Sequence, residues 1–252
     1  MSTKREGAKL VELLHLALLQ VLPSYMPPAE SVVKGGANLR LFYGSRRRSQ
    51  DIDFDYLGTR FHEVETKVDA ALAARAFRDL LRVAGMSITE PTKPKQTGTT
   101  RRWKFVVEGP GGILNTKIEF SARGVDPEWA LEPARDDVGR AVGLRVVKAV
   151  HYLPPAAIRQ KIRALAQRSA AEPRDVFDLD FLFGAHPDAL APGTIDGELL
   201  GAAGNSALSI PYDAFAELVV EYLEDDFVDI YGRQEVWSDM VLGVVERLER
   251  LR

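Results

Sequence analysis

The sequence predicts a mixed α/β fold in its first half and an all-helical second half. Two observations support this: early segments alternate polar and apolar residues with the period of a strand, and later segments repeat apolar residues at helical spacing. The strand-like segments are residues 51–57, 86–90, 99–108 and 113–121. A Gly-Pro-Gly-Gly sequence at residues 109–112 is a strong turn signal between the last two. These segments should therefore extend one sheet.

Helices are expected to flank this sheet. Residues 10–22 are the most apolar stretch, but they are too short to span a bilayer and include Glu12 and His15. A buried amphipathic helix is therefore the better interpretation. A short helix at residues 37–43 and one long helix at residues 62–84 should follow, the latter closed by a glycine.

Prolines in the second half of the sequence lie where helices are expected to begin. Proline favours the first turn of a helix, which predicts helix starts at Pro154-Pro155, Pro173 and Pro211. Residues 185–206, rich in glycine, alanine and proline, suggest a long connection. We therefore expect a sheet-containing domain over residues 1–142 and a helical domain over residues 143–252.

Composition narrows the classes of function. The 252 residues, 46% of them hydrophobic, are enough for a folded core. A net charge of -3 provides no bulk attraction to polyanions, so any contact with nucleic acid must come from local basic patches. The absence of cysteine excludes disulfides, thiolate zinc sites and cysteine nucleophiles. We expect a cytoplasmic protein that is neither exported nor membrane-bound, and an oxygen-bound metal if there is one.

The first strand carries the candidate chemistry. Residues two apart in a strand point to the same face, so Asp51 and Asp53 should project together while Ile52 and Phe54 face the core. Two carboxylates in one small volume repel each other unless a cation neutralises them, and magnesium prefers such oxygen ligands. A divalent metal site follows as a hypothesis. A solvated edge strand with outward acidic residues is the alternative.

Neighbouring residues favour phosphate chemistry. Gly35-Gly36, upstream, would let backbone amides approach a phosphate, and the arginine-rich residues 46–49 could hold a triphosphate or a phosphodiester backbone. Either feature alone is more often structural or solvated. No P-loop sequence is present, and a calcium loop is excluded because Tyr56 and His62 occupy its glycine and glutamate positions. The four histidines lack paired metal spacing.

The order Lys34-Gly35-Gly36, then Arg47 to Phe54 as Arg-Arg-Ser-Gln-Asp-Ile-Asp-Phe, resembles the nucleotidyltransferase motif of the AbiEii family, which includes toxins of the MenT type. The resemblance covers roughly residues 32–182 and implies a DNA polymerase β-type α/β (α+β) domain. A helical C-terminal domain, residues 143–252, would complete the active-site cleft. By this resemblance, Lys34, Gly35, Gly36, Arg47 and Ser49 would bind the nucleotide, and Asp51 and Asp53 the metals.

The resemblance extends to three further carboxylates and a lysine. Polymerase β-type folds place a third carboxylate on a neighbouring strand, and Glu119 is the candidate, with a simple surface role as the alternative. Lys161 would bind the triphosphate, Asp175 would orient it or another basic group, and Asp178 would bind nucleotide or support packing. Lys161 and Arg168 lie seven residues apart on one helical face, so they could equally be partners of these aspartates.

The resemblance implies metal-dependent nucleotidyl transfer. Mg²⁺ or Mn²⁺ would serve as cofactor, a nucleoside triphosphate as substrate, the 3′ end of transfer RNA as acceptor and a cognate antitoxin as partner. A basic segment with a tryptophan, residues 93–104, could contact the RNA by phosphate pairing and stacking, or could be a lysine-rich sheet edge. Two alternatives remain: transfer to a small molecule or protein, and a non-catalytic nucleotide-binding module.

Overall fold

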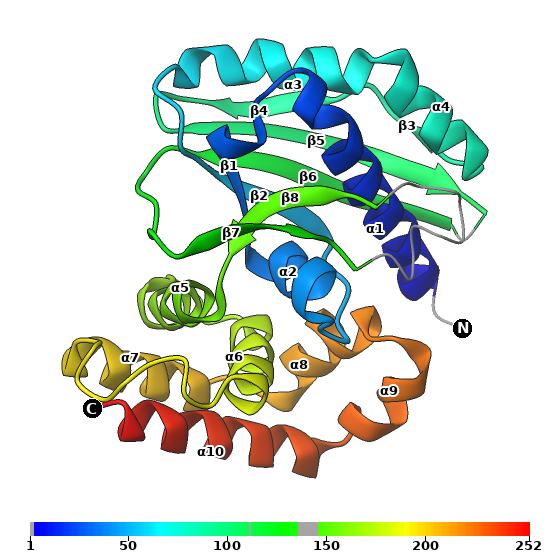
Figure 1. Cartoon of the computed structure of the whole chain (residues 1–252). Helices are drawn as coiled ribbons and strands as arrows, with labels where there is room; N and C mark the ends of the chain where they lie inside the picture. Colours follow the sequence, from blue (N-terminus) through cyan, green and yellow to red (C-terminus); the bar gives the residue numbers. More distant parts are fainter. Residues whose placement is uncertain (1–2, 111, 136–145) are drawn as a thin grey trace. The chain divides into compact units, whose positions relative to one another are not determined.

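The computed structural model describes residues 3–110, 112–135 and 146–252, which form two compact units (Figure 1). Unit 1 comprises residues 1–44 and 48–152, and unit 2 comprises residues 45–47 and 153–252. The predicted boundary between residues 142 and 143 lies outside the described residues. The residues just beyond it, Lys148–Tyr152, form a strand of unit 1.

Unit 1 is built on a mixed sheet that has eight strands among the described residues. The strands are β1 (Ser31–Lys34), β2 (Asp51–Tyr56), β3 (Ser87–Ile88), β4 (Thr92–Gln96), β5 (Thr100–Gly109), β6 (Gly112–Ser121), β7 (Trp129–Pro133) and β8 (Lys148–Tyr152). Their order is β3-β5-β6-β2-β1-β8-β7, with β4 paired to β5. Strand β2 is therefore central, between β6, to which it is parallel, and β1, to which it is antiparallel.

One face of this sheet is apolar and covered by helices. Ile52 and Phe54 of β2 are at most 1% exposed, as their alternation predicts. They pack in one cluster with residues of α1 (Thr3–Val21), α3 (Val64–Ala73) and α4 (Arg75–Val83), which lie along the sheet in Figure 1. Since period two places Asp51 and Asp53 on the opposite face, this packing directs the candidate carboxylates away from the core.

The N-terminal helix is a core element of unit 1. The span Lys4–Ser24 is long and apolar enough to cross a membrane by length and composition alone, yet 72% of its most apolar 18-residue window is buried inside the protein. Its residues Leu14 and Leu18 are fully buried in the apolar cluster. The predicted buried amphipathic helix is therefore confirmed.

Several expectations for unit 1 need correction. The single helix predicted at residues 62–84 is two helices, because Ala74 adopts an extended conformation with ψ 138° between α3 and α4. The short helix predicted at residues 37–43 begins two residues earlier, as α2 (Gly35–Asn38), and continues as a π-helical segment, Leu39–Tyr43. Strands β1, β4, β7 and β8 were not predicted; β4 is polar and contains a proline, which hides the strand pattern.

Apart from residues 45–47 and the connecting loops, the described residues of unit 2 form helices. They are α5 (Pro154–Gln167), α6 (Pro173–Ala185), α7 (Gly197–Leu208), α8 (Tyr212–Leu218), α9 (Asp225–Tyr231) and α10 (Gln234–Arg250). Prolines begin α5 and α6 as predicted, and Pro211 is the N-cap residue of α8. The predicted connection at residues 185–206 is partly wrong because it contains most of α7. Asp196 caps this helix by accepting hydrogen bonds from the amides of Glu198 and Leu199.

A buried ionic contact joins α1 to the π-helical segment Leu39–Tyr43 and to the loop before β2. Glu12 Oε2 accepts a hydrogen bond from Arg40 Nε at 2.9 Å and lies 3.5 Å from Arg48 Nε. All three side chains are at most 9% exposed. A charge in this position is stable only with its partners, because burial removes its hydration.

We predict that Glu12→Ala lowers the free energy of unfolding of unit 1 by about 3–5 kcal/mol, since it leaves buried arginines without their carboxylate. Urea unfolding measures the change. The matched control is Glu108→Ala, at an exposed position of β5, which should shift stability by less than about 0.5 kcal/mol. Equal losses in the two variants would contradict the role of Glu12.

Candidate functional site

The parallel pairing of β2 with β6 brings the three predicted metal ligands onto one face of the sheet. Asp53 lies opposite Glu119 in the register, and Asp51 lies opposite Lys117. The apolar residues that alternate with Lys117 and Glu119 in β6, Ile118 and Phe120, are fully buried on the other face. The spacing of two within each strand and the register between strands therefore concentrate three carboxylates in one place.

A lysine that the sequence analysis did not single out lies among these carboxylates. Lys117 Nζ is 3.4 Å from Asp51 Oδ2, 3.2 Å from Asp53 Oδ1 and 4.0 Å from Glu119 Oε2. Burial lowers the pKa of Lys117, but the charges of Asp53, Asp51 and Glu119 outweigh burial, so that the pKa is raised overall. The lysine is therefore a stable cation within the acidic group.

Glu119 has a second cationic partner. Its Oε2 accepts hydrogen bonds from Arg102 of β5, 2.6 Å from Nε and 2.5 Å from the terminal nitrogen. Arg102 lies directly opposite Glu119 in the β5–β6 register. With these cations in contact, no group of three or more histidine, aspartate or glutamate side chains in the described part of the chain is arranged as a ready-made metal site.

The predicted nucleotide-binding residues near β2 have structural contacts of their own. Lys34 Nζ donates to Asp55 Oδ1 at 2.5 Å, and Tyr152 donates its hydroxyl to Asp55 Oδ2 at 2.8 Å. Burial, and then the charge of Asp55, raise the pKa of this tyrosine. Ser49 Oγ donates to the Asp51 carbonyl at 2.7 Å. The Ser49 bond holds the backbone at the start of β2, and the other two hold the Asp55 side chain near its end.

The glycine pair lies beside the carboxylates. Gly35, the first residue of α2, has a φ of +68°, which disfavours any residue with a side chain. A Cβ at this position would lie 3.6 Å from Asp53 Oδ2. The backbone of Gly35 is therefore close to the carboxylate face, as a phosphate-approaching role requires.

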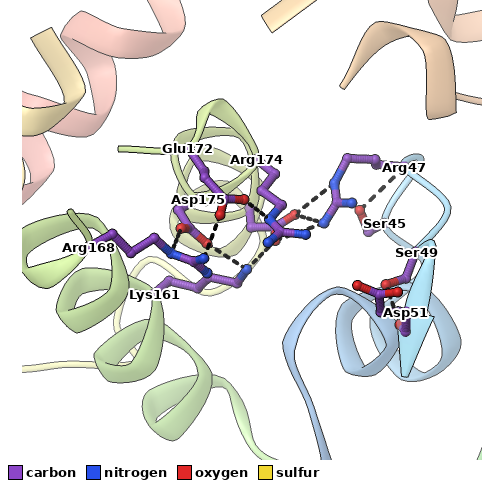
Figure 2. Close-up of polar contacts among 10 residues, drawn as sticks. Ser45, Arg47, Ser49, Asp51, Lys161, Arg168, Glu172, Arg174 and Asp175 are labelled. Atoms are coloured by element: carbon purple, nitrogen blue, oxygen red, sulfur yellow. Dashed lines mark hydrogen bonds and ion pairs between the residues drawn. The ribbon is translucent and has the colours of Figure 1, made fainter. Parts of the chain in front are cut away.

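The remaining predicted residues form a buried ionic network in unit 2. Lys161 of α5 contacts both carboxylates of α6, at 2.9 Å from Asp175 Oδ1 and 2.5 Å from Asp178 Oδ2. Both aspartates are fully buried. Arg168 Nε lies 2.9 Å from Asp175 Oδ2, and Figure 2 shows Lys161 and Arg168 converging on Asp175. The two basic residues are thus partners of the aspartates, as one interpretation of their spacing predicted.

Arg47 belongs to the same network. It donates from its terminal nitrogen to both Asp178 oxygens, at 3.1 and 3.0 Å. Burial raises the pKa of Asp178, but Arg47 and Lys161 outweigh burial and lower it overall. Asp178 is therefore held as an anion between two cations.

One part of the proposed RNA contact is wrong. Trp103 is 0% exposed and donates its indole N–H to Asp69 at 2.9 Å, so it cannot stack on RNA. Two of the basic residues of this segment already have acidic partners: Lys93 pairs with Glu65 and Asp69, and Arg102 with Glu119. The tryptophan faces the core because alternation in β5 sends every second residue inward.

The family model for the nucleotidyl transferase AbiEii toxin of a type IV toxin–antitoxin system matches residues 19–226. A solved structure of a proposed nucleotidyltransferase from H. pylori has a TM-score of 0.60 and 17% identity, with coverage of 100% of this chain and 99% of that chain. JHP933 from Helicobacter pylori has a TM-score of 0.55 and 17% identity, with coverage of 99% and 95%. No curated protein matches. These structural similarities confirm the predicted fold class.

We predict that Asp178→Asn lowers the free energy of unfolding of unit 2 by about 3–5 kcal/mol at pH 7, since Arg47 and Lys161 lose their shared anion. Because the folded pKa of Asp178 is below its usual value of 3.8, its contribution is complete above that pH and is lost as the pH falls through the folded pKa. Urea unfolding across this range, with hydrogen exchange of α6 amides, measures both effects.

The matched control for this variant is Asp180→Asn, in the same helix. Burial raises the pKa of Asp180, with partial opposition from Arg247, so its ionised form contributes no comparable stability. Asp180→Asn should therefore leave stability at pH 7 nearly unchanged. An Asp178→Asn variant that behaves in the same way would contradict the network.

Proposed function

Because the chain belongs to the AbiEii nucleotidyltransferase toxin family, we propose that it transfers a nucleotide from a nucleoside triphosphate to an acceptor hydroxyl. The observation that carries this proposal is the meeting of Asp51, Asp53 and Glu119 on one face of two paired strands. Carboxylates held together in this way cost stability, which favours a functional reason for them. We place the reaction at this face, beside Gly35.

The donor set fits a divalent metal. The ligands would be carboxylates alone, which suit Mg²⁺ or Mn²⁺, and a cation of the protein, Lys117, is already attracted into the same space. We propose that Asp51, Asp53 and Glu119 hold the metal. When bound there, such a metal would neutralise phosphate charge and favour deprotonation of the acceptor hydroxyl.

The residues of this chain would mainly position the reactants. The acceptor oxygen forms a bond to the α-phosphorus while the bond from this phosphorus to the bridging β-phosphate oxygen breaks, and pyrophosphate leaves. Glu119 is our candidate to accept the hydroxyl proton. The nucleotide would be approached by the backbone of Gly35 and Gly36 and by the side chains of Lys34 and Ser49. Charge placement of this kind stabilises a transition state without any rearrangement of solvent.

Basic residues of unit 2 also have a role in the proposed reaction. We assign triphosphate binding to Lys161 and Arg47, whose positive charges would also favour pyrophosphate departure. Asp175 and Asp178 orient Lys161, since each carboxylate contacts its ammonium. This assignment of unit 2 to catalysis, with residues 143–252 completing the active-site cleft, rests on the family resemblance.

The acceptor proposed is the 3′ end of transfer RNA, by resemblance to toxins of the MenT type. We assign phosphate contact to Lys95 and Lys104, on the paired strands β4 and β5. Trp103 takes no part because it is buried. A type IV toxin–antitoxin family implies an antitoxin partner. We propose that the protein acts in the cytoplasm, where its triphosphate and RNA substrates occur.

We predict that Asp53→Asn lowers nucleotide transfer at least about a hundredfold while the fold is retained, because it removes a metal ligand and also relieves carboxylate repulsion. The assay incubates radioactive triphosphates with RNA, protein and small-molecule acceptors, in the presence of Mg²⁺ or Mn²⁺ and then of a chelator. Asp79→Asn, which removes an exposed carboxylate of α4, should keep wild-type transfer. Wild-type turnover in Asp53→Asn would refute the site.

We predict that production of this protein alone arrests bacterial growth and that the Asp53→Asn form does not. Extended acceptor ends cannot be aminoacylated, so every ribosome loses substrates. Sequencing of transfer RNA 3′ ends after a short induction measures the change before growth stops. Arrest with unchanged ends would contradict the acceptor, and labelling of a small molecule or protein would favour a different nucleotidyl acceptor.

A further inference from the structure

The face of the sheet that bears Asp51, Asp53 and Glu119 also bears a lysine to which the proposed reaction assigns no role. Lys117 comes from β6, two residues before Glu119, and its ammonium lies 3.2–4.0 Å from oxygens of all three proposed metal ligands. Its side chain is only 21% exposed, compared with 26% for Asp51 and 29% for Asp53. It is therefore enclosed with these carboxylates and not directed into solvent.

We propose that Lys117 is a built-in counter-ion that stabilises the metal-free site and that a divalent metal must displace. The inference rests on the proposed metal site. It follows from the contacts: Arg102 pairs with Glu119, whereas Lys117 lies within 4.0 Å of Asp51, Asp53 and Glu119. Lys117 contacts both aspartates of β2, so its charge offsets the repulsion between their two carboxylates.

A metal on the same carboxylates would lie close to the lysine ammonium. Asp51 Oδ2 and Asp53 Oδ1 contact the ammonium, and magnesium binds carboxylate oxygens at about 2.0–2.1 Å. A metal on these oxygens would place a double positive charge beside the ammonium, and the two cations would repel each other. Lysine suits this temporary role because its charge sits on a flexible four-carbon stem. Metal binding is therefore weaker than the carboxylates alone would make it.

The test is Lys117→Met, which keeps the length of the side chain and removes its charge. Free Mn²⁺ is counted by electron paramagnetic resonance at low ionic strength, and the unfolding temperature is recorded without metal and with added Mn²⁺. We expect Lys117→Met to bind Mn²⁺ at least about tenfold more tightly, equivalent to about 1.4 kcal/mol. Its unfolding temperature should fall without metal and should rise more than that of the wild type when Mn²⁺ is added.

The matched control is Lys104→Met. Lys104 is exposed and lies opposite Lys117 in the β5–β6 register. The variant therefore removes the same charge from a neighbouring position. It should change Mn²⁺ affinity far less, because a solvated charge is screened. If Lys117→Met fails to fold, Lys117→Gln carries the same expectation with a polar side chain.

Unchanged Mn²⁺ affinity in the Lys117 variants, or an equal gain in Lys104→Met, would overturn the counter-ion role even if wild-type protein transfers nucleotides. No Mn²⁺ binding by any form would overturn the inference together with the metal site. Tighter Mn²⁺ binding by Lys117→Met, in a protein that transfers no nucleotide under any condition, would support the inference and defeat the proposed function.

Discussion

The register between β2 and β6 is the constraint on which the rest of unit 1 depends. It places Asp53 opposite Glu119 and Asp51 opposite Lys117, and the alternation of each strand then directs all four polar side chains to one face. A shift by one residue would exchange them with Ile52 and Ile118, which are fully buried under helices. The apolar packing on one face therefore determines the chemistry of the other.

The two units stabilise their charges differently. On the sheet of unit 1, the carboxylates and Lys117 keep between 15% and 29% exposure, so water and added ions can compete with their contacts. In unit 2, Asp175 and Asp178 have no exposed surface, and Lys161 is fixed between them. Removal of one partner from such a buried group leaves an uncompensated charge, which is costly. The first arrangement suits exchange of a ligand, and the second suits precise placement of one ammonium.

Patterns local in sequence predicted much of this protein. The period of two in residues 51–57 gave the face of Asp51 and Asp53, and prolines marked the starts of α5 and α6. Glu119 was placed near them by family resemblance, and the β2–β6 pairing brings it there. Tertiary contacts decided what remained. The spacing of Lys117 from Glu119 was visible, but its contacts depend on the register with β2. Trp103 is the opposite case, because its alternation with Arg102 and Lys104 is a local pattern that indicates a core position.

Unit 2 is built from two stretches of the chain that lie far apart in the sequence. Residues 45–47 belong to it, although the residues on both sides belong to unit 1. Arg47 is made early in translation, yet its partner Asp178 leaves the ribosome some hundred and thirty residues later. Since domains generally fold as they are synthesised, from the N-terminus, this short segment has to wait in an unfinished state. Residues 45–47 therefore complete their contacts only after α6 has been made, and a fragment beginning at Leu153 would lack the guanidinium that contacts the buried carboxylate of Asp178.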